Sequence, residues 1–177
     1  DCAGEVSIVG PPEATRHLAR VLLSQAAVHH APEDLHLALV YPDQNAQEWD
    51  CLARLPHLRM NGVFDGPISR RRVAPTQPAL EQLLREEIHE ASRQAARLNR
   101  TGGRKARPTG PRLLAVVEQE GPALPLAVPD NALDSAAIGA TVLYLVTDRL
   151  HEPSDPSLRL TVQHDGTIVI EDLRPVS

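Results

Sequence analysis

Residues 8–20 read IVGPPEATRHLAR. This stretch begins with the end of an apolar strand, passes through a glycine and two prolines, and ends in the first turns of an amphipathic helix. A strand, a glycine and a helix in this order form the place where mononucleotide-binding proteins hold phosphate. The first question is therefore whether this junction keeps the chemistry of a phosphate loop.

Alignment with the template G-x-x-x-x-G-K-[ST] predicts that the junction has lost it. With Gly10 as the first glycine, Thr15, Arg16 and His17 stand where the loop needs Gly, Lys and Ser or Thr. Two successive prolines remove backbone N–H donors that would cradle phosphate, and an imidazole replaces the hydroxyl that holds magnesium. Arg16 keeps a cation near a helix N-terminus, which leaves two alternatives: weak residual phosphate affinity, or a solvated helix residue.

A second landmark is the apolar run RLLAVVEQE at 112–120. Glu118 stands where a nucleotide hydrolase strand ends in a metal-holding Asp, and Gln119 stands where a water-activating Glu would follow. Because a glutamine amide cannot act as a general base, the sequence predicts no catalytic residue here. The alternative for Glu118 is an acidic residue that only ends a buried strand.

Along the rest of the chain, short apolar runs typical of strands alternate with segments whose apolar residues recur at helical spacing. Residues 60–69 are expected to be a loop, Thr76 an N-cap, and the Asp165-Gly166 pair the turn of a β-hairpin. The order predicts an α/β fold with a doubly wound, mostly parallel sheet of P-loop NTPase type, a C-terminal β-hairpin and one domain over residues 1–177. The expected strands are 5–10, 34–41, 70–75, 112–120, 140–147 and the two runs within 157–170, and the expected helices are 13–30, 46–55 and 76–98.

Composition narrows the function classes. The 177 residues carry a net charge of −5, which argues against nucleic-acid binding by bulk charge. No apolar run approaches the ~20 residues of a membrane span, and the N-terminus lacks a signal-peptide pattern, so a soluble domain is expected. Cys2 and Cys51 show no motif spacing, which favours a reducing, cytosolic compartment. A first residue other than methionine suggests a piece of a longer protein.

Several runs together resemble a known family. They are GPPEATRHLARVLLSQAAVHHAPEDLHLALV (10–40), EWDCLARLPHLR (48–59), RRVAPTQPALEQLLREEI (71–88), RLLAVVE (112–118), IGATVLYLV (138–146) and LRLTVQHDGTIVI (158–170). The chain is similar to the membrane-proximal, degenerate ATPase-like domain of EccC, the FtsK/SpoIIIE-family motor of actinobacterial type VII secretion. The family signature Trp-Asp-Trp-Leu-Lys-Trp-Leu-Pro-His is matched here by Trp49, Asp50, Leu52, Leu55, Pro56 and His57, while Cys51, Ala53 and Arg54 depart from it.

The resemblance implies a place in a larger machine. The parent protein would carry membrane helices upstream and ATPase domains downstream, form a homo-hexamer at the cytoplasmic face of the membrane, and use Mg-ATP. This domain would couple anchor to motor without hydrolysis and without a cofactor of its own; the alternative is a weak nucleotide-binding or slow ATPase domain. Its partners would be other domains of the motor chain and other channel subunits. Candidate interface residues are Trp49, Leu55, Pro56 and His57.

Residues 99–111 are Gly- and Pro-rich and basic, and predict a flexible loop. The loop could contact anionic lipid or nucleic acid, or be a solvated linker; without interleaved aromatic residues, specific nucleic-acid binding is not expected. The basic residues of this region are Arg97, Arg100, Arg104, Lys105 and Arg107.

The remaining reactive side chains indicate structural roles. His29, His30 and His36 are not expected to form a zinc site, because adjacent histidines at a helix end point in different directions. Cys51 is expected to be a buried thiol. Trp49, the only tryptophan, either fills the seam between sheet and helix or contacts a partner, and His57 either makes a polar contact or lies on the surface.

Overall fold

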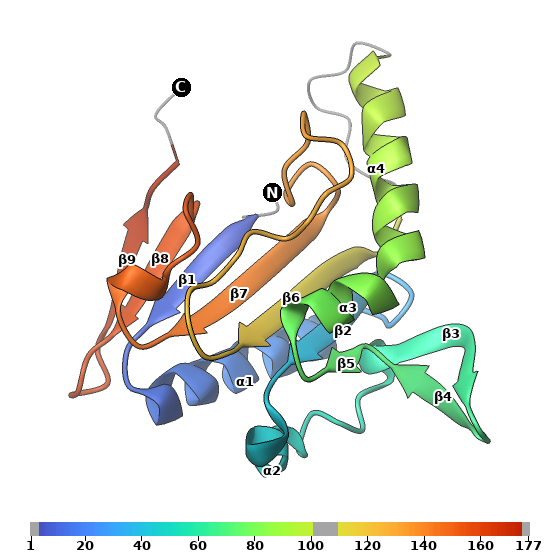
Figure 1. Ribbon diagram of the computed structural model, residues 1–177. Coiled ribbons are helices and arrows are strands. Elements are labelled where there is room, and N and C mark those ends of the chain that lie inside the picture. Colours follow the sequence, from blue (N-terminus) through green and yellow to red (C-terminus); the bar gives the residue numbers. More distant parts are fainter. Residues whose placement is uncertain (1–3, 101–109, 175–177) are drawn as a thin grey trace.

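The computed structural model describes residues 4–100 and 110–174. Its centre is a seven-stranded sheet with the strand order β5-β2-β6-β7-β1-β8-β9, with helices on both faces (Figure 1). Neighbouring strands are parallel except for β8 and β9, which form an antiparallel hairpin across Asp165 and Gly166. The α/β fold class expected from the sequence is confirmed. The strands are β1 (Glu5–Val9), β2 (Leu35–Val40), β5 (Val73–Ala74), β6 (Arg112–Glu118), β7 (Ala140–Val146), β8 (Leu158–Val162) and β9 (Ile168–Asp172).

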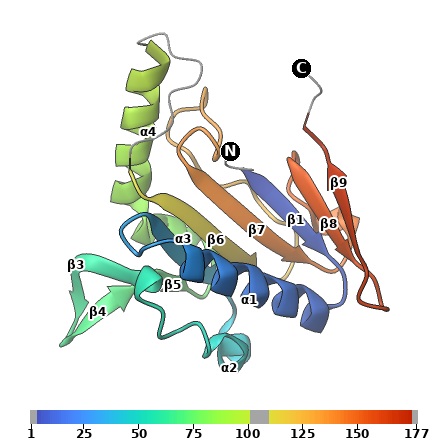
Figure 2. The ribbon, with the colours of Figure 1, turned by 180° about the vertical axis from the view of Figure 1, so that it is seen from behind.

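Each face of the sheet is covered by a different part of the chain. Helix α1 (Pro12–His29) lies along one face, and α3 (Gln77–Leu83) and α4 (Arg85–Arg100) cover the other (Figure 2). Parallel strands covered on both faces have few exposed positions, which explains their continuous apolar runs. The connection between β6 and β7 is irregular, and its apolar side chains join α3 and α4: Ala123, Leu126, Leu133 and Ile138.

The segment after β2 is mostly turns. It contains η1 (Asp43–Asn45), α2 (Ala46–Trp49) and η2 (Pro56–Leu58), so the helix expected over 46–55 ends at Trp49. Pro56 does not close a helix but starts the short turn η2, where a missing N–H costs nothing. A further short turn, η3 (Arg149–His151), follows β7.

Two other expectations are corrected. Residues 60–69, expected as a loop, contribute most of the antiparallel hairpin β3 (Arg59–Asp65) and β4 (Ile68–Arg71), which turns at Gly66, with φ of +61°. The helix expected over 76–98 begins after the Thr76 cap as predicted but breaks at Leu84. Leu84 is a good helix former and is buried in the core, and the sequence carries no breaker signal at this position.

Helix α4 continues to Arg100, beyond the predicted start of the basic loop at 99. Residues 101–109, which make up most of that loop, lie outside the described part of the chain. Among the helices that the structure describes, none has the length and hydropathy needed to cross a bilayer.

Candidate functional site

A pocket of about 440 Å³ lies at the carboxyl ends of β1, β2, β6 and β7. In open α/β sheets this is the edge at which ligands bind. Four of the five residues expected at a vestigial nucleotide site line the pocket together, namely Gly10, Thr15, Arg16 and Glu118. His17 is exposed on α1 and is not part of the lining.

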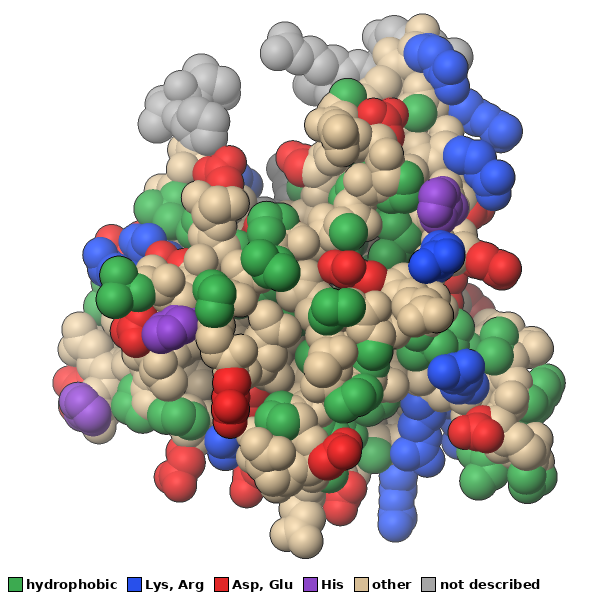
Figure 3. Space-filling model, in the orientation of Figure 1, with side chains coloured by type: hydrophobic (Ala, Val, Ile, Leu, Met, Phe, Trp, Pro, Cys, Tyr) green, Lys and Arg blue, Asp and Glu red, His purple; other side chains and the backbone are tan. Residues whose placement is uncertain are grey.

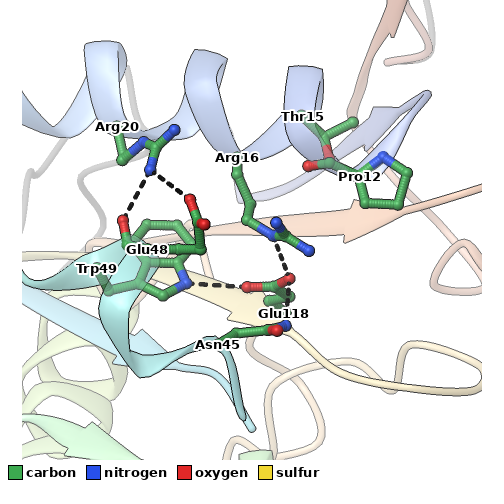
Figure 4. A network of polar contacts seen from close by, with 8 residues as sticks. All are labelled: Pro12, Thr15, Arg16, Arg20, Asn45, Glu48, Trp49 and Glu118. Atoms are coloured by element: carbon green, nitrogen blue, oxygen red, sulfur yellow. Dashed lines mark hydrogen bonds and ion pairs between the residues drawn. The ribbon is translucent and has the colours of Figure 1, made fainter. Parts of the chain in front are cut away.

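The Glu118 carboxylate is the centre of a polar network (Figure 4). Arg16 Nε donates to Glu118 Oε1 at 2.6 Å, and Asn45 Nδ2 donates to the same oxygen at 2.9 Å. Trp49 Nε1 donates to Glu118 Oε2 at 2.9 Å. The Arg16 and Glu118 side chains are only 17% and 12% exposed, so their ion pair is largely shielded from water. Glu118 therefore does more than end a strand, and Arg16 is not a solvated helix residue.

The three donors come from two segments that pack around the end of β6. Trp49 is 1% exposed and stacks on Tyr41, with ring centroids 6.0 Å apart, so the indole N–H is held in a fixed position. Arg20 on α1 donates to the backbone oxygen of Glu48 at 2.8 Å and to its carboxylate at 3.0 Å. These Arg20–Glu48 hydrogen bonds join α1 to α2 beside the Glu118 network (Figure 4).

The connection between β1 and α1 is too short for a phosphate loop. Only Gly10 and Pro11 separate the strand from the helix. The Gly10 N–H donates to the Val146 oxygen at 3.1 Å, and the Thr15 N–H donates to the Pro11 oxygen at 3.0 Å. The Thr15 hydroxyl is also used, because it donates to the Pro12 oxygen at 3.0 Å. These donors, which a loop would offer to phosphate, are bonded within the chain.

Gly10 is fixed by its surroundings. Its φ is +154°, and a Cβ at this position would lie 2.7 Å from the Val162 backbone oxygen on β8. The glycine that starts the phosphate-loop template is therefore required here by close packing of the β1–α1 turn against β8.

Sequence reasoning missed Asn45, Thr147 and His151, which also line the pocket. Asn45 follows the turn PDQ after β2, and Thr147 follows β7 directly. Polar residues after the carboxyl ends of parallel strands were the available signal. His151 lies in η3 and had none.

Of the candidate interface residues, two are inside the domain. Trp49 belongs to the Glu118 network, and the buried His57 ring uses Nε2 in a 2.9 Å contact with the His30 oxygen. Of the two alternatives for His57, the polar contact is the one present, and Trp49 fills the seam between sheet and helix. Leu55 is half-buried and Pro56 exposed, so these two keep a surface that a partner could contact.

Other sequence expectations have mixed outcomes. Cys51 is exposed, which corrects the expectation of a buried thiol. Arg100 is exposed and donates to the Ala96 oxygen at 3.2 Å, while Arg104, Lys105 and Arg107 lie outside the described residues. Across residues 4–100 and 110–174, no group of three or more His, Cys, Asp or Glu side chains is placed to hold a metal ion.

A second, partly buried network lies near the β3–β4 hairpin. Arg72, between β4 and β5, is 2% exposed and donates from Nε to both Glu87 oxygens at 3.2 and 3.1 Å. His36 Nδ1 lies 3.2 Å from Glu87 Oε2. Burial opposes ionisation of Glu87, but its bonds to His36 and Arg72 outweigh that effect and hold its pKa below the usual value. The network fastens β2, α4 and the start of β5 together.

Comparison with known proteins gives two similarities. No protein-family model matches the chain. Over 54 residues it is 44% identical to the ESX-4 secretion system protein EccC4 of Mycobacterium tuberculosis, an alignment that covers 30% of this chain and 4% of that protein. The solved structure of EssC ATPases 2 and 3 from Geobacillus thermodenitrificans superimposes with a TM-score of 0.58 and 12% identity, covering 90% of this chain and 32% of the other.

The two similarities concern different properties. The match to EssC shows that the chain shares the fold of the EssC ATPase domains, and the local identity to EccC4 supports the resemblance found in the sequence. The chain spans only a small part of either protein. Together they confirm that this chain resembles the ATPase domains of EccC and EssC.

Proposed function

We propose that this chain is a non-hydrolytic coupling and assembly domain of a type VII secretion motor, and that it links a membrane anchor to downstream ATPase domains. The observation that supports this most strongly is the hydrogen bonding of Glu118. Its carboxylate accepts hydrogen bonds from Arg16, Asn45 and Trp49 at the edge of the sheet where a nucleotide would bind. The similarity to EccC4 supports the secretion context.

The two sides of the site are joined by side chains of this chain itself. In a working P-loop NTPase, the nucleotide and its magnesium bridge the loop after the first strand and the acidic strand end. Here the Arg16–Glu118 ion pair makes the equivalent link within the chain, and α2 is joined to the same carboxylate. The domain then has one arrangement whether or not nucleotide is present, as a fixed connector requires.

The proposal includes the surroundings of the domain. Its partners are other domains of the same motor chain and other channel subunits, within a homo-hexamer at the cytoplasmic face of the membrane. Mg-ATP serves the other domains of the parent protein, and this domain needs no cofactor. Arg97 and Arg100 at the exposed end of α4, with Arg104, Lys105 and Arg107, contribute contact with anionic lipid.

The test uses the full-length motor. Deletion of this domain is expected to abolish secretion while ATP turnover by the remaining domains stays measurable. A matched variant, Glu118→Gln, removes the charge of the central carboxylate at nearly constant volume and is expected to reduce secretion without reducing turnover. Normal secretion by the deletion variant contradicts the coupling role.

A second candidate function is a weak nucleotide-binding or slow ATPase domain with a divergent phosphate loop. The pocket itself favours it, because about 440 Å³ of space lies beside Arg16 and Thr147. Phosphate release by the purified chain would distinguish the two functions. A slow ATPase requires turnover that Arg16→Ala removes, whereas the coupling role predicts no turnover in either protein.

A further inference from the structure

Two exposed apolar ribbons lie at opposite edges of the molecule. One is the β3–β4 hairpin, where Val63, Phe64 and Ile68 face solvent, with Phe64 and Ile68 65% and 62% exposed. The other is the edge strand β9, where Ile168, Val169 and Ile170 are exposed and Ile170 is 66% exposed. In Figure 3 the apolar side chains at the lower right cover the β3–β4 hairpin, and others lie over β8 and β9 at the left.

Both ribbons have free hydrogen-bonding edges. Among the described residues, β9 pairs only with β8, and β3 and β4 pair only with each other. Consecutive strand residues point to opposite sides, and both Val169 and Ile170 are exposed, so neither face of β9 is covered at these positions. On β3 the side chain of Met60, near the base of the hairpin, is buried, whereas Val63 and Phe64 nearer the turn are exposed. A two-stranded ribbon is marginal by itself, and an apolar edge strand readily adds another strand.

The charges of the two ribbons are opposite. Strand β4 reads ISRR and ends in the exposed Arg70 and Arg71, whereas β9 reads IVIED and ends in Glu171 and Asp172. Glu171 also contacts Arg149 and Arg159, and Asp172 contacts Arg174 at 2.6 Å. The Asp172–Arg174 pair is more than half exposed, and such pairs contribute little, so it can exchange for an incoming arginine.

The positions of the ribbons determine the symmetry. β9 is one end of the seven-stranded sheet, and the hairpin leads directly into β5 at the other end, as both ribbon views show (Figures 1 and 2). A contact between the two ribbons of different copies leaves one free ribbon on each copy. Such a head-to-tail contact repeats until it closes a ring or extends a filament.

We infer that the β3–β4 hairpin of one copy adds to the free edge of β9 on a second copy of this chain, so that the sheet continues from copy to copy. The apolar side chains then cover one another, and the arginines of β4 meet the acidic end of β9. This contact stands on the two surfaces alone and holds whether or not the pocket binds nucleotide.

Sedimentation velocity of the purified chain tests this contact. The hairpin variant Phe64→Thr/Ile68→Thr and the edge variant Val169→Thr/Ile170→Thr keep strand propensity but remove apolar surface. Each is expected to weaken self-association at least about tenfold relative to the unaltered chain, the effect of withdrawing a large apolar side chain from an interface. Val28→Thr, at an exposed position on α1, is the matched control and leaves association unchanged.

Mixing the two variants distinguishes head-to-tail contact from other modes. Each variant keeps the ribbon that the other has lost, so an equimolar mixture is expected to form 1:1 dimers that do not grow further. Circular dichroism establishes that both variants are folded. An unaltered chain that stays monomeric at all concentrations, variants that associate normally, or a mixture that remains monomeric would each overturn the inference.

Discussion

Replacing Glu118 by alanine perturbs the centre of the site most directly. The substitution removes one carboxylate that accepts hydrogen bonds from Arg16, Asn45 and Trp49 at 2.6 to 2.9 Å. Breaking a buried ion pair from one side costs about 3–5 kcal/mol, because the partner charge is left unpaired. Arg16 is 17% exposed and lines an open pocket, so water can solvate it after the change, and we expect a smaller loss of about 2–4 kcal/mol.

Urea unfolding, followed by circular dichroism and by the fluorescence of Trp49, measures this loss. Glu48→Ala is the matched control. Glu48 forms a more exposed ion pair with Arg20, which lies on α1 as Arg16 does, so this substitution should cost under about 1 kcal/mol of stability. The double variant Arg16→Ala/Glu118→Ala should lose less than the sum of the single losses, with a coupling of about 1–3 kcal/mol. A Glu118→Ala variant that unfolds within about 0.5 kcal/mol of the unaltered chain refutes the reasoning, because that is the ordinary scatter of surface substitutions.

Three further outcomes are expected. Gly10→Ala should destabilise the chain by about 2 kcal/mol or more in thermal unfolding, because its Cβ would lie 2.7 Å from the Val162 oxygen. Gly66→Ala is the control: its φ is also positive, but the space around it is open, so it should cost only about 1 kcal/mol. Equal losses for the two variants contradict the packing argument. The pKa of Glu87 is lower in the folded chain than its ordinary value of 4.5, so ionised Glu87 stabilises the fold above pH 4.5 and this stabilisation is lost as the pH falls through the folded pKa. The difference in unfolding free energy between the unaltered chain and Glu87→Gln should therefore shrink in acid. A difference that does not change with pH opposes this. Thr76→Ala should lower the unfolding free energy, measured in urea, by about 1 kcal/mol, because the Thr76 hydroxyl accepts a hydrogen bond from the backbone N–H of the third residue of α3. An unchanged unfolding free energy would show that this cap does not stabilise the helix.

The sequence predicted the sheet well because its signals were local. Continuous apolar runs such as Leu35–Val40 and Ala140–Val146 have few alternatives to buried parallel strands, and Asp165-Gly166 suits a tight hairpin turn. The β3–β4 hairpin was missed because residues 60–69 contain two glycines, Gly62 and Gly66, and few β-branched residues. The break falls at Leu84, a good helix former on the apolar stripe, so a helical periodicity does not reveal it.

The candidate site was predicted in part. The template placed Gly10, Arg16 and Glu118 correctly at one edge of the sheet, since the order of strand and helix fixes where strand ends lie. That Arg16 and Glu118 bond to each other could not be predicted, because their separation of 102 positions carries no pairing signal. Trp49 was recognised as important, but its bond to Glu118 depends on where the turns after β2 place the indole.

The proposed coupling role requires that Glu118, a carboxylate of the chain itself, engages Arg16 and so keeps this cation from nucleotide phosphates. Isothermal titration of the purified chain with Mg-ATP tests it most directly. We predict no saturable heat for the unaltered chain at micromolar protein, and a saturable signal with magnesium-free tripolyphosphate only after Glu118→Ala frees Arg16. A one-site Mg-ATP isotherm with the unaltered chain would contradict the claim.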